Sequence, residues 1–293
     1  MDEKLRKFLK VVELGSFTKA AQQLHVSQPA ITMAVKDLER ELDVKLFIRQ
    51  GNRIRCTDEA RLITDKARAI AGTMHDLRTE LTELRGSLAP ISVGMIDSIA
   101  EQIFRRPDMQ EMVQSNTSHS ITVDSSSRLA EAVVLGKLDG AFIAQSESSN
   151  NATLTVSQLG DECLVAVIAS TAKKSLNQTA PLPYISYNEA SATAQLVSSA
   201  LRKREISFRP VLYSTSPEVM LKLCLRGVGF AVLPDWQVAP YLKDESLSCL
   251  LSSKKASNVL RPVQYVRRAG SFEPRGLRVF ADTVEGLLAN NEK

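Results

Sequence analysis

One apolar seam constrains the architecture of this chain more than any other feature. Apolar residues follow one another at alternating spacings of three and four, at Ala60, Ile63, Ala67, Ile70, Met74, Leu77, Leu81 and Leu84. This heptad spacing predicts one helix from about Thr57 to Ser87 that packs against another helix. Such a helix would be about 45 Å long, more than one small domain's core needs. We therefore expect a coiled coil between two copies of the chain, with the contact at Ile63, Ile70, Met74, Leu77, Leu81 and Leu84.

Residues 17–39, which precede the seam, contain two short helical patterns separated by a polar break. In the first pattern, Ala20, Ala21 and Leu24 share one helical face. Ser27 can cap a second helix, because its hydroxyl can accept a hydrogen bond from a free N–H group of the first turn. An earlier helix is expected over residues 2–14.

The second helix of this pair has two faces of different chemistry. Ile31, Val35 and Leu38 form the apolar stripe that would be buried. The other face is polar, short in side chain and free of acids, as a helix in the DNA major groove needs. An ordinary helical hairpin is the alternative for this pattern taken alone. The candidate DNA-binding residues here are Thr18, Ser27, Gln28, Pro29, Ala30, Thr32, Met33 and Lys36.

A basic β-hairpin is predicted to follow the helix pair. Lys45–Arg49 and Arg53–Thr57 are strand-like runs around a segment with turn chemistry. Residues 1–57 hold eleven Lys or Arg and seven Asp or Glu, so the chain's whole net charge of +4 lies there. Three helices followed by a basic hairpin indicate a winged helix-turn-helix, with a solvated basic turn as the alternative. The candidate phosphate or minor-groove contacts of the hairpin are Arg49, Arg53 and Arg55.

Composition narrows the class of protein. The hydrophobic fraction of 44% and the charged fraction of 24% are ordinary for a globular protein. A length of 293 residues predicts two or three compact units. Because no apolar run approaches a membrane span and the N-terminus is charged, we expect a cytoplasmic protein without a membrane partner.

The cysteines and histidines do not form a chemical site by their spacing. Cys56, Cys163, Cys224 and Cys249 are far apart and contain no C-x-x-C pair, so reduced thiols are expected. The histidines lack metal-ligand spacing, and no G-x-S-x-G, P-loop or H-E-x-x-H motif occurs. We therefore expect no enzyme, no metal and no cofactor.

From residue 90 onward the pattern changes to alternating strands and helices. Gly86–Pro90 ends the long helix and is predicted to be a hinge. Roughly 200 residues of α/β pattern suggest two lobes, and 146–151 is expected to be a loop. Strands are expected at 91–96, 120–124, 140–144, 163–169, 184–187, 209–213, 230–233 and 263–267, with helices from 98, near 128–135, and at 193–203, 217–226 and 274–288.

The N-terminal motifs resemble those of the LysR-type transcriptional regulators. That family has an A-A-x-x-L helix, found here at 20–24, and then S-Q-P-A-x-T, found at 27–32. L-E at 38–39 and L-F-x-R at 46–49 also match, and Thr57 opens the long helix as the family's T-x-x-G does. Weaker landmarks are 135–141, Leu-Gly-Lys-Leu-Asp-Gly-Ala, and 226–234, Arg-Gly-Val-Gly-Phe-Ala-Val-Leu-Pro.

This resemblance implies a multidomain fold. It comprises a winged helix-turn-helix at 1–57, a coiled-coil linker helix and hinge at 58–89, and a two-lobed α/β effector domain like periplasmic binding proteins. One lobe would be 90–160 plus 268–293 and the other 161–267, with a small-molecule ligand between them. The family also implies homodimers or homotetramers that bind and bend double-stranded DNA.

Three positions depart from the family pattern. Met33 stands where a long polar side chain is usual, Asp43 replaces a Gly of the helix turn, and Ala60 replaces the Gly of T-x-x-G. Met33 can offer only an apolar contact, such as one to a thymine methyl. Sequence preference should therefore depend more on Gln28, Thr32, Lys36 and the hairpin.

In this family the effector meets the start of the first effector-domain helix and the loop after the second strand. The resemblance therefore implies a site at Ser98, Ile99, Ser125, Ser126 and Ser127, faced by Tyr187, Asn188, Ser191 and Thr215. Hydroxyl groups and free N–H groups at helix N-termini favour an anion such as a carboxylate.

Two alternatives accompany this interpretation of the effector site. Ser98, Ser127 and Ser216 can equally be plain helix caps, and Asp97 and Asp124 would repel an anion if they faced the cleft. The alternative mode of regulation is a thiol redox response through Cys163, Cys224 or Cys249.

Overall fold

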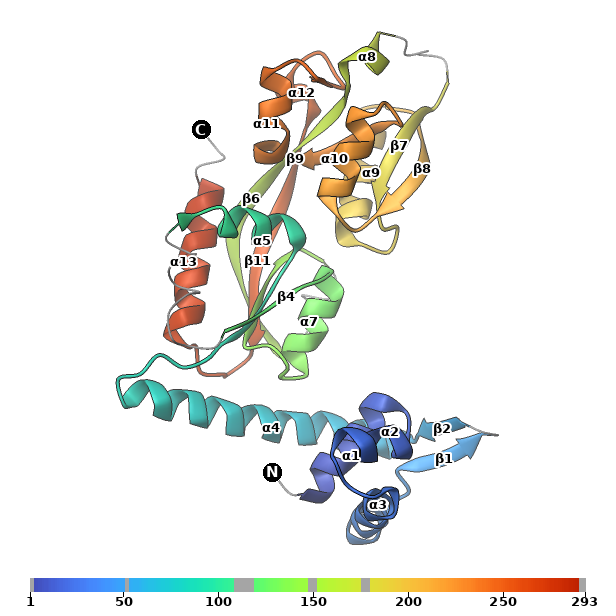
Figure 1. Cartoon of the computed structure of the whole chain (residues 1–293), viewed down its shortest axis with the longest axis vertical. Helices are drawn as coiled ribbons and strands as arrows, with labels where there is room; N and C mark the ends of the chain where they lie inside the picture. The colour runs from blue at the N-terminus through green and yellow to red at the C-terminus, as the bar shows by residue number, and fades with distance from the viewer. Residues whose placement is uncertain (1–2, 51–52, 108–118, 147–151, 175–179, 290–293) are drawn as a thin grey trace. The chain divides into compact units, whose positions relative to one another are not determined.

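The computed structural model describes residues 3–50, 53–107, 119–146, 152–174 and 180–289 (Figure 1). The chain divides into two compact units, Met1–Arg85 and Gly86–Lys293. The first unit contains α1 (Glu3–Leu14), α2 (Phe17–Gln23), α3 (Gln28–Leu42), the hairpin strands β1 (Phe47–Gln50) and β2 (Arg53–Cys56), and α4 (Asp58–Leu84).

The helix pair forms because each end has a local signal. Ser27 caps α3, and its side chain accepts a hydrogen bond of 3.3 Å from the backbone N–H of Ala30. The helix ends at Asp43, which takes a left-handed conformation with φ of 50°. An aspartate can therefore adopt the left-handed conformation at this turn, where the family usually has a glycine.

The helices share one small core. Phe8, Ile31, Val35 and Leu38 are buried, as the apolar spacing predicts. The Phe47 ring from the hairpin packs against Phe8 and Phe17, with ring centroids 5.7 and 5.4 Å apart. These contacts fasten the wing to the helix pair.

The long helix α4 is confirmed and leaves most of its seam exposed. Thr57 caps it by accepting a hydrogen bond of 3.1 Å from Ala60 N–H, and the same hydroxyl donates to the Lys45 carbonyl over 2.7 Å. Within the single chain, the exposed apolar residues of the seam are Ile70, Met74, Leu77, Leu81 and Leu84, with exposed fractions of 36 to 76%.

The second unit is built on one nine-stranded sheet in the order β4-β3-β5-β11-β6-β9-β7-β8, with β10 paired to β6. Its strands are β3 (Ser92–Met95), β4 (Ser120–Val123), β5 (Gly140–Ala144), β6 (Leu154–Ala169), β7 (Leu182–Tyr187), β8 (Phe208–Ser214), β9 (Phe230–Pro234), β10 (Leu247–Cys249) and β11 (Asn258–Arg268). Its helices are α5 (Asp97–Phe104), α7 (Ser126–Val134), α8 (Ser170–Lys173), α9 (Ala192–Lys203), α10 (Pro217–Leu225), α11 (Asp235–Lys243), α12 (Lys254–Ser257) and α13 (Arg275–Ala289).

Two long antiparallel strands, β6 and β11, join two lobes with separate cores (Figure 1). The first core draws on β3, β5, α5, α7 and α13, and the second on β7, β9, α9 and α10. Between the cores the register of the pair shifts at Val263/Gln264, opposite Gly160 with φ of 136°. The sheet therefore bends where the two lobes meet.

The contacts correct two expectations about this unit. The sequence predicts a lobe boundary at 267/268, but Val263, Tyr265 and Val266 belong to the first core, so on β11 the change falls near residue 262. Strand β6 is also longer than the expected 163–169, because it begins at Leu154, which pairs with Arg268 of β11. Of the expected loop 146–151, only Ser146 is within the described residues.

Gly229 provides a sharp test of this packing. A Cβ atom at Gly229 would lie 2.5 Å from the Pro183 carbonyl oxygen, which is backbone and cannot move aside cheaply. Gly229→Ala should therefore lower the free energy of unfolding by about 1–3 kcal/mol, measured by urea denaturation. Gly286→Ala is the matched control, because a Cβ there meets nothing within 4 Å and should add up to about 1 kcal/mol of helix stability. Equal stability of the two variants would contradict the packing.

Candidate DNA-reading surface and effector cleft

The N-terminal part of α3 presents a polar surface without acids. Gln28, Pro29, Met33 and Lys36 are exposed, and 66% of the surface of Met33 is accessible. Ala30 and Thr32 are half-buried beside them, and Thr18 is exposed on α2. The residues expected to contact bases therefore share one accessible face.

Two of these side chains hold each other in place. Gln28 Nε2 donates a hydrogen bond of 2.8 Å to Thr32 Oγ1, and that hydroxyl donates over 3.1 Å to the Gln28 carbonyl. The Gln28 carboxamide is thus oriented before any ligand arrives. An ordered amide with a free oxygen can make the paired hydrogen bonds that read an adenine edge.

The acids of α3 are all in its second half, and each has a basic or backbone partner. Asp37 pairs with Arg40 at 3.2 Å, and Glu41 pairs with Lys4 at 2.7 Å. Glu39 accepts a hydrogen bond of 2.8 Å from Leu46 N–H, which orients the segment entering the wing. The N-terminal half of α3 therefore carries no negatively charged side chain.

In the wing, Arg55 is exposed. Arg49 pairs with Ile54 and Arg53 with Gln50 along the hairpin backbone, so the expected strands are confirmed. The side chains of Arg49 and Arg53, and the turn at 51–52, lie outside the described residues.

In the α/β unit a cavity of about 700 Å³ lies between the two lobes. Its walls contain Asp97 at the start of α5, the segment opening α7, the end of β7 and the start of α9. The cavity is large enough for a small metabolite. The residues expected to meet an effector that line it are Ser98, Ser125, Ser126, Ser127, Tyr187, Asn188, Ser191 and Thr215.

Ile99 is the exception among the expected effector residues. It is completely buried in the first core. Ile99 and Ile103 are four residues apart, so they lie on one face of α5, and that face packs against the sheet. Assigning Ile99 to the site was therefore wrong.

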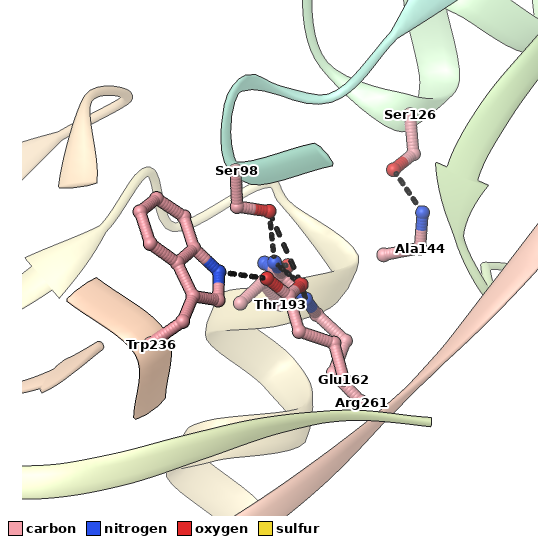
Figure 2. Close-up of polar contacts among 7 residues, drawn as sticks. All are labelled: Ser98, Ser126, Ala144, Glu162, Thr193, Trp236 and Arg261. Atoms are coloured by element: carbon pink, nitrogen blue, oxygen red, sulfur yellow. Dashed lines mark hydrogen bonds and ion pairs between the residues drawn. The ribbon is translucent and has the colours of Figure 1, made fainter. Parts of the chain in front are cut away.

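The serines around the cavity have different roles. Ser191 is a helix cap, whose side chain accepts a hydrogen bond of 3.1 Å from Ala194 N–H. Ser126 accepts one of 3.1 Å from Ala144 N–H (Figure 2), whereas Ser125, at the N-cap of α7, makes no side-chain cap bond. Ser98 is not a cap either, because Ile96 occupies that position of α5.

Ser98 belongs instead to a buried network that the sequence did not reveal. Arg261 on β11 and Glu162 on β6 form a buried ion pair at the point where the strands pass between the lobes (Figure 2). Arg261 also donates to Ser98 Oγ over 2.6 Å and to Thr193 Oγ1 over 3.2 Å. One guanidinium group therefore connects α5 of the first lobe with α9 of the second.

The network continues into the second lobe through Trp236. Its indole Nε1–H donates to Glu162 Oε1 over 3.4 Å, and the Arg105 guanidinium lies 4.6 Å from the centre of its ring. Burial alone would lower the pKa of Arg261, but the Glu162 carboxylate beside it raises that pKa above the ordinary value. The Glu162 carboxylate therefore favours the charged form of Arg261 and lies beside it as its counterion.

Two further carboxylates line the cavity. Asp124 accepts a hydrogen bond of 2.7 Å from Ser125 N–H and lies 3.6 Å from Arg128. The pKa of Asp97 is raised by burial and, after that, by the negative charges of Glu101 and Glu218. The two acids that the sequence flagged as unfavourable to an anion do face the cavity.

Two thiols of the second lobe, Cys163 and Cys224, have raised pKa values. Cys224 is buried, and this raises its pKa to about 12. Burial, followed by the charge of Asp235, also raises the pKa of Cys163. Because the thiolate is the reactive form, a raised pKa lowers the reactivity of both thiols. Cys249 is half-buried.

Across the described ranges, no three His, Cys, Asp or Glu side chains form a group that could hold a metal ion. The helices within the same ranges are too short or too polar to cross a membrane.

Comparison with known proteins adds the family context. Residues 3–61 match the family model for the bacterial regulatory helix-turn-helix protein of the lysR family. Residues 89–289 match the LysR substrate binding domain. The RuBisCO operon transcriptional regulator of Allochromatium vinosum is 25% identical over 239 residues, which is 78% of each chain.

Solved structures share the fold along nearly the whole chain. ArgP from Mycobacterium tuberculosis aligns with a TM-score of 0.70 and 19% identity over 98% of this chain and 97% of that one. Full-length LysG from Corynebacterium glutamicum, solved with bound effector Arg, aligns with a TM-score of 0.65 and 21% identity over 99% of both chains.

The buried ion pair makes a prediction about stability. Glu162→Met would leave the Arg261 guanidinium buried without its counterion, which should cost about 3–5 kcal/mol of unfolding free energy in chemical denaturation. The double variant Glu162→Met/Arg261→Met removes both charges and should recover at least half of that loss. A single variant as stable as the parent chain would refute the pairing.

Proposed function

Because the chain belongs to the LysR family of bacterial transcriptional regulators, we propose that it is a cytoplasmic homodimer or homotetramer that binds a specific double-stranded DNA sequence. A small anionic effector in the cleft of the α/β unit modulates that DNA binding or bending. The α4 seam joins the copies, and two α3 helices read two half-sites.

The observation that carries the DNA-reading part is the surface of α3. Its exposed end is polar and free of acids, and the Gln28 amide is oriented by its bond to Thr32. Lys36 and the wing residue Arg55 supply positive charge beside that surface. Base contacts from the helix with phosphate contacts from its flanks are the division of labour expected of such a motif.

The observation that supports an effector is the polar cavity between the lobes. The start of α7 presents the hydroxyls of Ser125 and Ser127 beside the N–H groups of its first turn, a setting that favours a carboxylate, and Arg128 there pairs with Asp124. LysG was solved with the effector Arg bound, which supports a small-molecule effector for a domain of this fold.

A thiol-based sensor remains the second candidate, because Cys249 is half-buried. The raised pKa values of Cys163 and Cys224 argue against it. Unchanged DNA binding after peroxide treatment would exclude this candidate, and an oxidant response lost in Cys249→Ser would favour it.

The recognition helix can be tested by removing its two ordered polar side chains. We expect the double variant Gln28→Ala/Thr32→Ala to lose about tenfold or more of the preference for the operator upstream of the chain's own gene over random DNA. The reason is that a good base contact contributes about 1–3 kcal/mol of discrimination. Weak, salt-dependent binding to any DNA should persist, because the basic groups remain. Mobility shifts against specific and random fragments at several salt concentrations measure both effects.

Arg40→Ala is the control for that double variant, because Arg40 is exposed in the last turn of α3 and pairs with Asp37. It should keep the operator preference. The same footprint for the double variant and the parent chain would count against α3 as the reader.

The coiled-coil seam can be tested with charges. Leu77→Asp/Leu81→Asp places like charges at the proposed contact and should yield monomers in analytical ultracentrifugation, with operator affinity lost. Leu62→Asp is the matched control, because Leu62 is 62% exposed on the same helix but off the seam. Dimers that persist in the double variant at low concentration would disprove the seam.

A further inference from the structure

The cleft contains one carboxylate that has no paired cation among the described residues. Four charged side chains line it, namely Asp97, Asp124, Arg128 and Arg261. Arg261 is neutralised by Glu162, and Asp124 lies 3.6 Å from Arg128. Asp97 makes neither a hydrogen bond nor an ion pair with any residue in the described ranges.

The surroundings of Asp97 do not offer it a cation. Glu101, one turn further along α5, is already bound to Arg105 at 2.7 Å. Glu218 on α10 of the other lobe lies 3.2 Å from Lys222. Burial and then these two acids raise the pKa of Asp97, so its charge is held at a free-energy cost that a bound cation would relieve.

A second group in the same wall also lacks a partner. Tyr187, at the end of β7, has 5% of its surface accessible, and it lines the cavity. Its hydroxyl has no hydrogen-bond partner among the described residues. Burial raises the pKa of Tyr187, Arg261 lowers it, and the charges of Glu162 and Asp97 raise it further.

A buried hydroxyl without a partner is costly, and so is a partly buried carboxylate without a counterion. One ligand group can satisfy both, because an ammonium group has three N–H donors and a positive charge. The carboxylate would accept one of these hydrogen bonds and the phenol oxygen another. Arg261 does not oppose this, because Glu162 cancels its charge locally.

We propose that Asp97 and Tyr187 form an ammonium-binding subsite inside the effector cleft. The effector is then a small amphoteric molecule, with a protonated amine against this subsite and an anionic group at the start of α7. This inference rests on the proposed function and extends it, because a simple carboxylate would leave both groups of the subsite without a partner.

The test uses the full chain and a panel of matched compounds. The panel contains α-, β- and ω-amino acids, their N-acetyl derivatives, which lack the ammonium group, and dicarboxylates of the same length. Binding is read as a rise in unfolding temperature and confirmed by calorimetric titration. We expect at least one free amino acid to bind, and its N-acetyl derivative to bind about tenfold more weakly or worse.

Variants locate the subsite. Asp97→Asn keeps the shape and removes the charge, and it should lower the affinity for the bound amino acid by about tenfold or more. Tyr187→Phe should lower it by a smaller factor. Asp282→Asn on the exposed side of α13 is the control and should bind as the parent chain does. Circular dichroism of each variant shows whether it is folded.

Three outcomes would overturn the subsite: binding of dicarboxylates or N-acetyl compounds in preference to amino acids, an unchanged affinity in folded Asp97→Asn, or no binding by any amino acid of the panel. The proposed function is judged separately by operator shifts with each compound. A dicarboxylate that binds and alters the shift would overturn the subsite and keep the effector role. An amino acid that binds through Asp97 without altering the shift would support the subsite and overturn the effector role.

Discussion

The α/β unit depends on the buried ion pair between Glu162 and Arg261. These residues lie on the two strands that connect the lobes, and their remaining bonds reach Ser98 on one side of the cleft and Thr193 on the other. A charge pair taken out of water is favourable only when its geometry and further hydrogen bonds are complete. One guanidinium group therefore links α5 and α9 across the cavity.

The sequence is most informative where structure is local. The capped start of α3, the apolar stripe of Ile31, Val35 and Leu38, and the heptad spacing of α4 each arise from residues within a few turns, and the winged helix and long helix are confirmed. The family's fold class is confirmed as well, with alternating strands and helices after residue 90. Short elements such as α11 and β10 have no comparable periodic signal, because Pro240 interrupts the one and the other spans three residues.

The site shows where sequence reasoning ends. Glu162 and Arg261 are 99 positions apart, and no local motif marks either of them as a partner of Ser98. The family resemblance places Ile99 in the cleft with Ser98, at the start of the first effector-domain helix. A single step along a helix turns a side chain by about 100°, and Ile99 lies in the core. The sequence indicates that Asp97 and Asp124 would repel an anion if they faced the cleft, and both line the cavity. The local spacing already separates the two, because Asp124 has Arg128 four residues on and Asp97 has Glu101, and the structure shows the first pair formed.

The central claim of this account is that two α3 helices, joined through the α4 seam, read a two-fold DNA site. Repeated selection of bound fragments from a random DNA library by the full chain, followed by sequencing, tests that claim most directly. The account predicts one enriched motif made of two inverted half-sites, with centres separated by about one turn of DNA or a multiple of it. A library without an enriched motif, or one enriched only in single half-sites, would contradict it.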